Sequence, residues 1–301
     1  MLHHGSFPCH LDADSGTERQ RVDRLRVEIA GQQIAYLDSH GGREDRTVIF
    51  VHGNSSSAGT WLPVLTGSFG QRFRCLALDL PGHGKSEPAR DRSYYSLPGY
   101  AAVLAGFARA LGAADAVVVG WSMGGQIAME AAPALPGAEG LVIFGAPPVA
   151  SLAQMAEAFL PNPAVGALFR ASVSEPEARL LARSYTAPGS TLDTGELVSD
   201  ILATDGAARA GLQSSAGEGR FADEIAIVAG LRQPLAILQG ADEQLVSLDY
   251  LRTLNFPALW RGEVQVIPGA GHALHLEAPQ QFAALLTEFM EDTGFMEDTG
   301  S

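Results

Sequence analysis

A serine between two glycines follows directly on an apolar run near the middle of the chain. The run 116–119 ends at Gly120-Trp121-Ser122-Met123-Gly124. A strand that turns sharply into a helix has no room for side chains beside the turn, and glycines two positions before and after the serine leave that room free. The run is typical of a buried parallel strand, and residues 126–134 continue at helical spacing. The alternative is a glycine-rich turn with a capping serine, but the flanking patterns favour a strand-turn-helix unit that presents Ser122.

Strand and helix patterns alternate along most of the chain. Short apolar runs that suit buried parallel strands lie at 48–51, 75–78, 117–119, 141–144, 235–238 and 264–267. Helical patterns lie between or after them at 97–111, 126–135 and 279–290. Ahead of them, residues 25–37 alternate apolar and polar side chains around a Gly31 turn, which predicts an antiparallel hairpin. The expected fold class is α/β, a doubly wound and mostly parallel sheet with an antiparallel N-terminal hairpin.

One long interval interrupts this alternation. Residues 148–229 contain helical pieces and no convincing strand, and they are too many for a loop. We expect an inserted helical lid at 148–229 and a core formed by 22–147 and 230–292. A polar N-terminal tail at 1–21 and a C-terminal tail at 293–301 complete the predicted organisation.

Composition excludes several classes of partner. The formal net charge is −14, which disfavours nucleic acid and anionic membrane surfaces, so a small molecule is the expected ligand. Cys9 and Cys75 form no disulfide framework, and neither a signal peptide nor a membrane-spanning run is recognised. We expect a cytoplasmic protein, and the sequence leaves its oligomeric state open.

Polar residues follow three of the predicted strands. In a parallel sheet these strand ends lie on the same edge, so residues at 52–57, 239–243 and 268–272 can converge on Ser122. A serine hydroxyl needs an imidazole to take its proton and a carboxylate to orient the imidazole. His272 is the expected base because it lies nearer its strand end than His275 does. The carboxylate is either Asp242 or Glu243, and the order serine, acid, histidine fits this topology.

Backbone N–H groups complete the expected site. The Met123 N–H begins the helix after the serine, and the Asn54 N–H comes from the facing loop, so both are candidates for an oxyanion hole. No spacing of histidines, cysteines and carboxylates suggests a zinc site, so no metal and no cofactor are expected.

Together these motifs resemble a known family. Residues 52–54, 79–86, 120–124 and 269–272 resemble the α/β-hydrolase superfamily. Residues 52–57, 120–122, 145–149 and 242–243 are similar to the AidH-type N-acyl-homoserine lactone lactonases. The resemblance implies a serine hydrolase that opens the lactone ring of these signals, the chemistry of quorum quenching, with Glu243 as the acid. Residues expected to contact the substrate are Trp121, Ser55, Phe159 and Tyr185.

Other functions share these motifs. A generic carboxylesterase of small acyl esters is the main alternative, and perhydrolases and carbon–carbon bond hydrolases keep the same serine arrangement. A ligand-sensing protein of this fold that turns over slowly is a further alternative from a different class.

Overall fold

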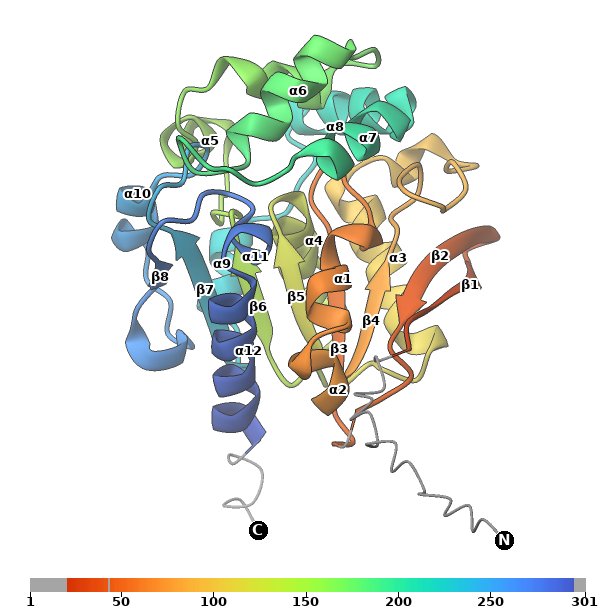
Figure 1. The fold of residues 1–301 in the computed structure, drawn as a ribbon, viewed down its shortest axis with the longest axis vertical. Coiled ribbons are helices and arrows are strands. Elements are labelled where there is room, and N and C mark those ends of the chain that lie inside the picture. Colours follow the sequence, from red (N-terminus) through yellow and green to blue (C-terminus); the bar gives the residue numbers. More distant parts are fainter. Residues whose placement is uncertain (1–20, 43, 295–301) are drawn as a thin grey trace, which may run out of the picture.

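Eight strands form one sheet at the centre of the protein (Figure 1). The structure is a computed structural model that describes residues 21–42 and 44–294. The strands lie across the sheet in the order β1-β2-β4-β3-β5-β6-β7-β8. Their bounds are β1 Asp23–Ile29, β2 Gln32–Asp38, β3 Thr47–Val51, β4 Arg74–Leu78, β5 Val117–Trp121, β6 Leu141–Phe144, β7 Leu235–Gly240 and β8 Gln265–Ile267.

Strand β2 runs opposite to the other strands of the sheet. Strand β2 pairs antiparallel with β1 and with β4, whereas the pairings from β4 through β8 are parallel. This confirms the predicted mostly parallel sheet with an antiparallel N-terminal hairpin. The short apolar runs become strands because both faces of the sheet are covered, as strand β3 illustrates. Phe50 packs on Trp61 and Phe69 on one face, with ring centroids 5.0 and 6.2 Å away, while Ile49 and Val51 join the apolar cluster of the other face.

Helices cover both faces of the sheet. Helices α1, α2, α11 and α12 lie in front of it in Figure 1, and α3, α4 and α9 lie behind. The helices that flank the sheet are α1 Leu62–Leu65, α2 Ser68–Arg72, α3 Leu97–Ala110, α4 Met123–Ala131, α9 Glu224–Ala229, α10 Leu248–Thr253, α11 Leu274–Glu277 and α12 Pro279–Gly294. Short 3-10 turns are η1 Ala58–Trp61, η2 Arg92–Tyr94, η3 Ala132–Ala134 and η5 Trp260–Gly262.

The chain between β6 and β7 forms a cap over the carboxyl ends of the strands, at the top of Figure 1. We use "cap" for its elements α5 Leu152–Ala158, η4 Pro163–Phe169, α6 Glu175–Ser184, α7 Gly195–Ala203 and α8 Gly206–Gly217. The next helix, α9, packs against α4 beside the sheet, although it falls within the interval 148–229 expected to form the lid. The cap therefore encloses the edge of the sheet to which Ser122 belongs.

The ends of the chain are described only in part. Residues 1–20, most of the expected N-terminal tail, and 295–301 lie outside the described residues. Helix α12 continues through Gly294, so the first two residues of the expected C-terminal tail are helical. Within 21–42 and 44–294, no helix combines the length and apolar character needed to cross a membrane.

A carboxyl group at the contact between α4 and α9 makes stability depend on pH. Glu130 accepts a hydrogen bond from the Ala222 N–H at 2.9 Å, and burial raises the pKa of Glu130 from 4.5 to about 7. Since the folded pKa lies above the unfolded one, the folded state binds this proton more tightly. The stability that it contributes is full below about pH 4.5 and is lost as the pH rises through 7.

Glu130→Gln removes this titration but keeps an acceptor for the Ala222 N–H. Relative to wild type, the variant is expected to gain about 2 kcal/mol of unfolding free energy between pH 4.5 and pH 8. This is less than the full shift in pKa implies, because the carboxyl keeps some contact with solvent. Urea unfolding at the two pH values measures the difference. Glu157→Gln, at an exposed position of α5, is the matched control. An equal response of both variants to pH would contradict the assignment.

Candidate active site

Ser122 lies at the turn between β5 and α4 in a backbone conformation that residues other than glycine rarely adopt. Its φ is 55° and its ψ is −125°, and its N–H donates to the Phe144 carbonyl at 2.8 Å. A Cβ on Gly120 would collide with the Gly124 carbonyl, and one on Gly124 would collide with the carbonyl of Val51 in the neighbouring strand. The two glycines are therefore required by close approach of the backbone, and the predicted strand-turn-helix unit is present.

His272 and Glu243 form a buried pair next to this turn. His272 Nδ1 lies 2.8 Å from Glu243 Oε2, and the two side chains are 1% and 4% exposed. The other carboxylate oxygen, Oε1, accepts from the Leu245 N–H at 2.7 Å. Because the carboxylate accepts the Nδ1 proton, the lone pair of the neutral imidazole is on Nε2. The adjacent Asp242 is exposed to solvent, so of the two candidate acids Glu243 is the one that meets the imidazole.

The free nitrogen of His272 lies at the same cavity as the serine. Ser122 and His272 both line it, and the buried Nε2 has no hydrogen-bond partner among the described residues. No Ser122–His272 hydrogen bond is formed between the described side chains, and catalytic hydrogen bonds commonly tighten only when substrate binds.

Gly145, just after β6, lies directly against the imidazole of His272. Its φ is +59°, and a Cβ there would come within 2.5 Å of His272 Cε1. Gly145→Ala is therefore expected to displace the ring and to lower kcat/KM about 100-fold, because misplacing a catalytic group by about 1 Å costs about that much.

Gly112→Ala is the matched control for this substitution. Gly112 also has a positive φ, +65°, but a Cβ there would meet nothing within 4 Å. It carries the same kind of backbone strain far from the site, so its kcat/KM should stay near wild type. Equal losses of activity in both variants would show that backbone strain, and not the contact with His272, is responsible.

Two aromatic residues, Trp121 and Tyr185, form hydrogen bonds with the loop that carries His272. Trp121 Nε1 donates to the His272 carbonyl at 2.9 Å, and the Tyr185 carbonyl accepts from the Ala273 N–H at 2.6 Å. The rings of Trp121 and Tyr185 lie 5.7 and 5.6 Å from the imidazole. Both were expected to contact substrate, but neither lines the cavity, and both side chains are buried.

The side chain and the carbonyl of Asn54 are held by hydrogen bonds. Asn54 Nδ2 donates to the Leu168 carbonyl at 3.0 Å, Oδ1 accepts from Ser55 Oγ at 2.9 Å, and the Tyr185 hydroxyl donates to its carbonyl at 3.4 Å. Within the described chain, the N–H groups of Asn54 and Met123 have no protein acceptor. Ser55, another expected substrate contact, instead bonds Asn54 and accepts from buried Arg209, so it lies outside the cavity lining.

The cavity at Ser122 is small and mostly apolar. Its volume is about 260 Å³. Its polar lining residues are Asn54, Ser122, Gln126 and His272, and its apolar ones come mainly from the cap and include the expected Phe159. Such a cavity suits an acyl chain with a reactive carbonyl at one end.

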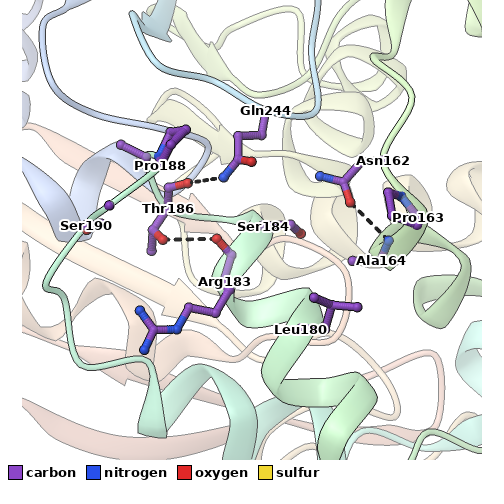
Figure 2. Close-up of a pocket in the computed structure, with 12 residues that line it drawn as sticks. Asn162, Pro163, Ala164, Leu180, Arg183, Ser184, Thr186, Pro188, Ser190 and Gln244 are labelled. Carbon is purple, nitrogen blue, oxygen red and sulfur yellow. Dashed lines mark hydrogen bonds between the residues drawn. The ribbon is translucent and has the colours of Figure 1, made fainter.

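A second cavity, of about 380 Å³, opens between α6 and the chain that follows it (Figure 2). Neither Ser122 nor His272 lines it. Figure 2 shows Gln244 and Thr186 side by side on the lining of this cavity, where Gln244 Nε2 donates to the Thr186 carbonyl at 2.7 Å. This bond joins the chain after α6 to the residue that follows Glu243, so it helps to fix the backbone next to Glu243.

The remaining histidines of the motifs have structural partners. His275 is stacked among aromatic rings, including Trp61, with its Nε2 2.7 Å from Thr60 Oγ1, and burial lowers its pKa to about 3. His52 Nε2 accepts from the Leu80 N–H at 3.1 Å. Over residues 21–42 and 44–294, no group of three or more histidine, cysteine, aspartate or glutamate side chains could hold a metal ion.

Two lining residues that bear on the site were given no role from the sequence. Gly145 is one: it belongs to the stretch 145–149 that resembles the lactonases, but no contact with the imidazole was expected of it. Gln126 is the other, and its signal was available: it lies four positions after Ser122, near the start of the predicted helix.

Comparison with known proteins identifies the family and agrees with the fold. The sequence model of the alpha/beta hydrolase family matches residues 48–285. A crystal structure of the N-acyl homoserine lactonase AidH, a glutamate-to-glycine mutant complexed with N-hexanoyl homoserine, has a TM-score of 0.85 and 36% identity, covering 91% of this chain and 98% of that chain. A serine-to-glycine AidH mutant complexed with N-hexanoyl homoserine lactone has the same TM-score, with 37% identity over 90% of this chain and 98% of that chain.

Curated relatives extend the range of chemistry. The 2-succinyl-6-hydroxy-2,4-cyclohexadiene-1-carboxylate synthase of Serratia proteamaculans is 30% identical over 261 residues, 84% of this chain and 96% of that protein. The chloroplastic protein PHYLLO of Arabidopsis thaliana is 25% identical over 88% of this chain, which spans 17% of its length. The family match covers most of the chain, and the fold agrees with it. The chain belongs to the alpha/beta hydrolase family.

Proposed function

We propose that this hydrolase of ester bonds opens the lactone ring of N-acyl homoserine lactones, with Ser122 as nucleophile, His272 as base and Glu243 as the acid that orients it. The observation that carries the proposal is the buried 2.8 Å contact between His272 Nδ1 and Glu243 Oε2 beside the cavity that Ser122 lines. The likeness to AidH, solved with N-hexanoyl homoserine and with its lactone, supports the choice of substrate.

In the first half of the reaction, His272 Nε2 takes the proton of Ser122 Oγ as Oγ bonds to the lactone carbonyl carbon. The carbonyl electron pair moves onto oxygen, and the N–H groups of Asn54 and Met123 stabilise that charge. Such a donor typically contributes about 3 to 4 kcal/mol in the transition state. The ring C–O bond then breaks, and the imidazolium returns the proton to the leaving alkoxide.

In the second half, water cleaves the acyl-enzyme. The alkoxide formed from a lactone stays attached to the acyl group, so its protonation by His272 prevents the ring from closing again. His272 then takes a proton from water, the hydroxyl attacks the acyl carbon, and the Ser122–acyl bond breaks as Oγ regains a proton. The net reaction adds one water to the lactone and yields a hydroxy acid.

The cap supports the choice of an acyl-bearing substrate. Met155, Phe159, Phe169 and Leu212 of the cap line the cavity of about 260 Å³. Enclosure by these side chains favours an apolar chain. We propose that the cap shelters the acyl chain while the lactone ring lies against Ser122.

Acid release measures the proposed reaction directly. Each ring opening yields a carboxylic acid, so a pH-stat assay with N-butanoyl and N-hexanoyl homoserine lactones should record continuous base uptake with purified protein. Product identified as N-acyl homoserine by mass spectrometry completes the test. Cleavage of simple aryl esters without any lactone opening would instead identify a generic carboxylesterase.

A time course separates an enzyme from a slow ligand-sensing protein of this fold. Multiple turnovers per protein molecule at a constant rate are expected. A burst of one equivalent followed by no further product would contradict the proposed catalytic role and favour ligand sensing.

A further inference from the structure

One polar side chain of the cavity at Ser122 has no role in the proposed reaction. Gln126 lines this cavity, and its Nε2 is buried without a hydrogen-bond partner among the described residues. Buried amide groups in native structures nearly always have a partner, so an unpaired one in a ligand cavity indicates an atom supplied by water or by a ligand.

The other polar groups of the lining are already engaged. The side chain of Asn54 is bonded to Leu168 and Ser55, while Ser122 and His272 act on the scissile bond. The lining contributed by α3 and the cap is apolar and offers no side-chain acceptor to Gln126. Gln126 therefore remains available to recognise a polar group of the substrate that is not itself cleaved.

Its place on the helix fixes which part of a substrate it can reach. Gln126 lies near the start of α4, four positions after Ser122, which precedes the helix, and both residues line the same cavity. Long helical side chains lean toward the helix N-terminus, which here means toward Ser122. In an N-acyl homoserine lactone, the amide is attached to the ring carbon next to the scissile carbonyl, only a few bonds from the carbon that Ser122 attacks.

We propose that Gln126 is a specificity-determining residue, whose Nε2 donates a hydrogen bond to the amide oxygen of the acyl group. The inference rests on the proposed lactonase function and adds a requirement to it. The protein then distinguishes lactones that carry an amide from alkyl lactones of the same length, because an alkyl chain leaves the Gln126 amide unpaired.

A pair of matched substrates tests this recognition. N-hexanoyl homoserine lactone is compared with α-heptyl-γ-butyrolactone, in which two methylene groups replace the amide. Wild type is expected to prefer the first about 10- to 100-fold in kcat/KM, the range of one buried hydrogen bond and the unpaired group left without it. In Gln126→Met, a side chain of similar length without polar groups, this ratio should fall toward one, mainly through a higher KM for the amide substrate.

Two further variants define the role of the side chain. Gln126→Glu keeps the length but removes the donor, so it should lose the preference as Gln126→Met does. Glu130→Gln, one turn further along the same helix and not part of the cavity lining, should keep the wild-type ratio.

The outcomes separate this inference from the proposed function. A wild-type protein that opens neither lactone overturns both. A wild-type protein that opens N-hexanoyl homoserine lactone supports the function. In that case, a parallel fall for both substrates in Gln126→Met, or an unchanged ratio, overturns the role of Gln126 alone.

Discussion

Ser122→Ala is expected to lower kcat for lactone opening by about a million-fold. The hydroxyl is the atom that bonds to the substrate, and no other nucleophile is present among the polar residues that line the cavity. Alanine removes only Oγ, so the φ of 55° at this position and the fold around it should be preserved. The measurement is single-turnover product formation at high protein concentration, with thermal unfolding to verify the fold.

The oxyanion donors and the cavity remain in that variant. A residual rate about 1,000- to 10,000-fold above the uncatalysed reaction is therefore expected, since binding and the N–H groups of Asn54 and Met123 do not depend on Oγ. Turnover near the wild-type value would exclude Ser122 as the nucleophile. It would then require a mechanism in which His272 activates water directly.

Glu243→Gln is expected to lower kcat by about 10,000-fold. The amide keeps the volume of the carboxylate, but it no longer stabilises the imidazolium that forms when His272 takes the proton. If the amide nitrogen faces Nδ1, it also favours the tautomer with the proton on Nε2, which cannot accept from Ser122. KM should change little, because Glu243 does not line the cavity.

The neighbouring residue provides the matched control for this prediction. Asp242→Asn makes the same chemical change one position earlier, at an exposed side chain, and should leave kcat within a few-fold of wild type. A large loss in Asp242→Asn together with a small one in Glu243→Gln would reverse the assignment of the acid.

Much of the fold and the centre of the site could be predicted from the sequence. The six apolar runs became β3 to β8, and for β3 to β7 the reason is that parallel strands covered on both faces need continuous apolar sequence, which is visible without a structure. The turn at Ser122 was predictable because close backbone approach requires its two glycines. The pairing of His272 with residue 243 followed only from resemblance, since spacing alone left Asp242 equally possible.

The orientation of side chains around the site could not be predicted in the same way. Trp121 precedes Ser122 in the sequence, but its side chain packs against the loop of His272, where Nε1 donates to the His272 carbonyl. Tyr185 follows the last residue of α6, and its ring lies 5.6 Å from the imidazole without lining the cavity. Such placements depend on how distant elements pack together, and local sequence patterns do not encode that packing.

Hydrogen bonds between the cap region and the core restrict how a substrate can enter. The end of α5 is bonded to the chain after β7, with the Leu160 N–H donating to the Leu245 carbonyl at 2.9 Å, and Gln244 and Ala273 donate to the chain after α6. At the other side, the Asp205 N–H donates to the Gly82 carbonyl at 2.8 Å. A hinge motion that lifted the whole cap would break these bonds and detach the supports of the acid and base loops. Substrate is therefore expected to enter when side chains of the lining such as Met155 and Phe159 rotate. The space that these rotations open then limits the width of the acyl group that can reach Ser122.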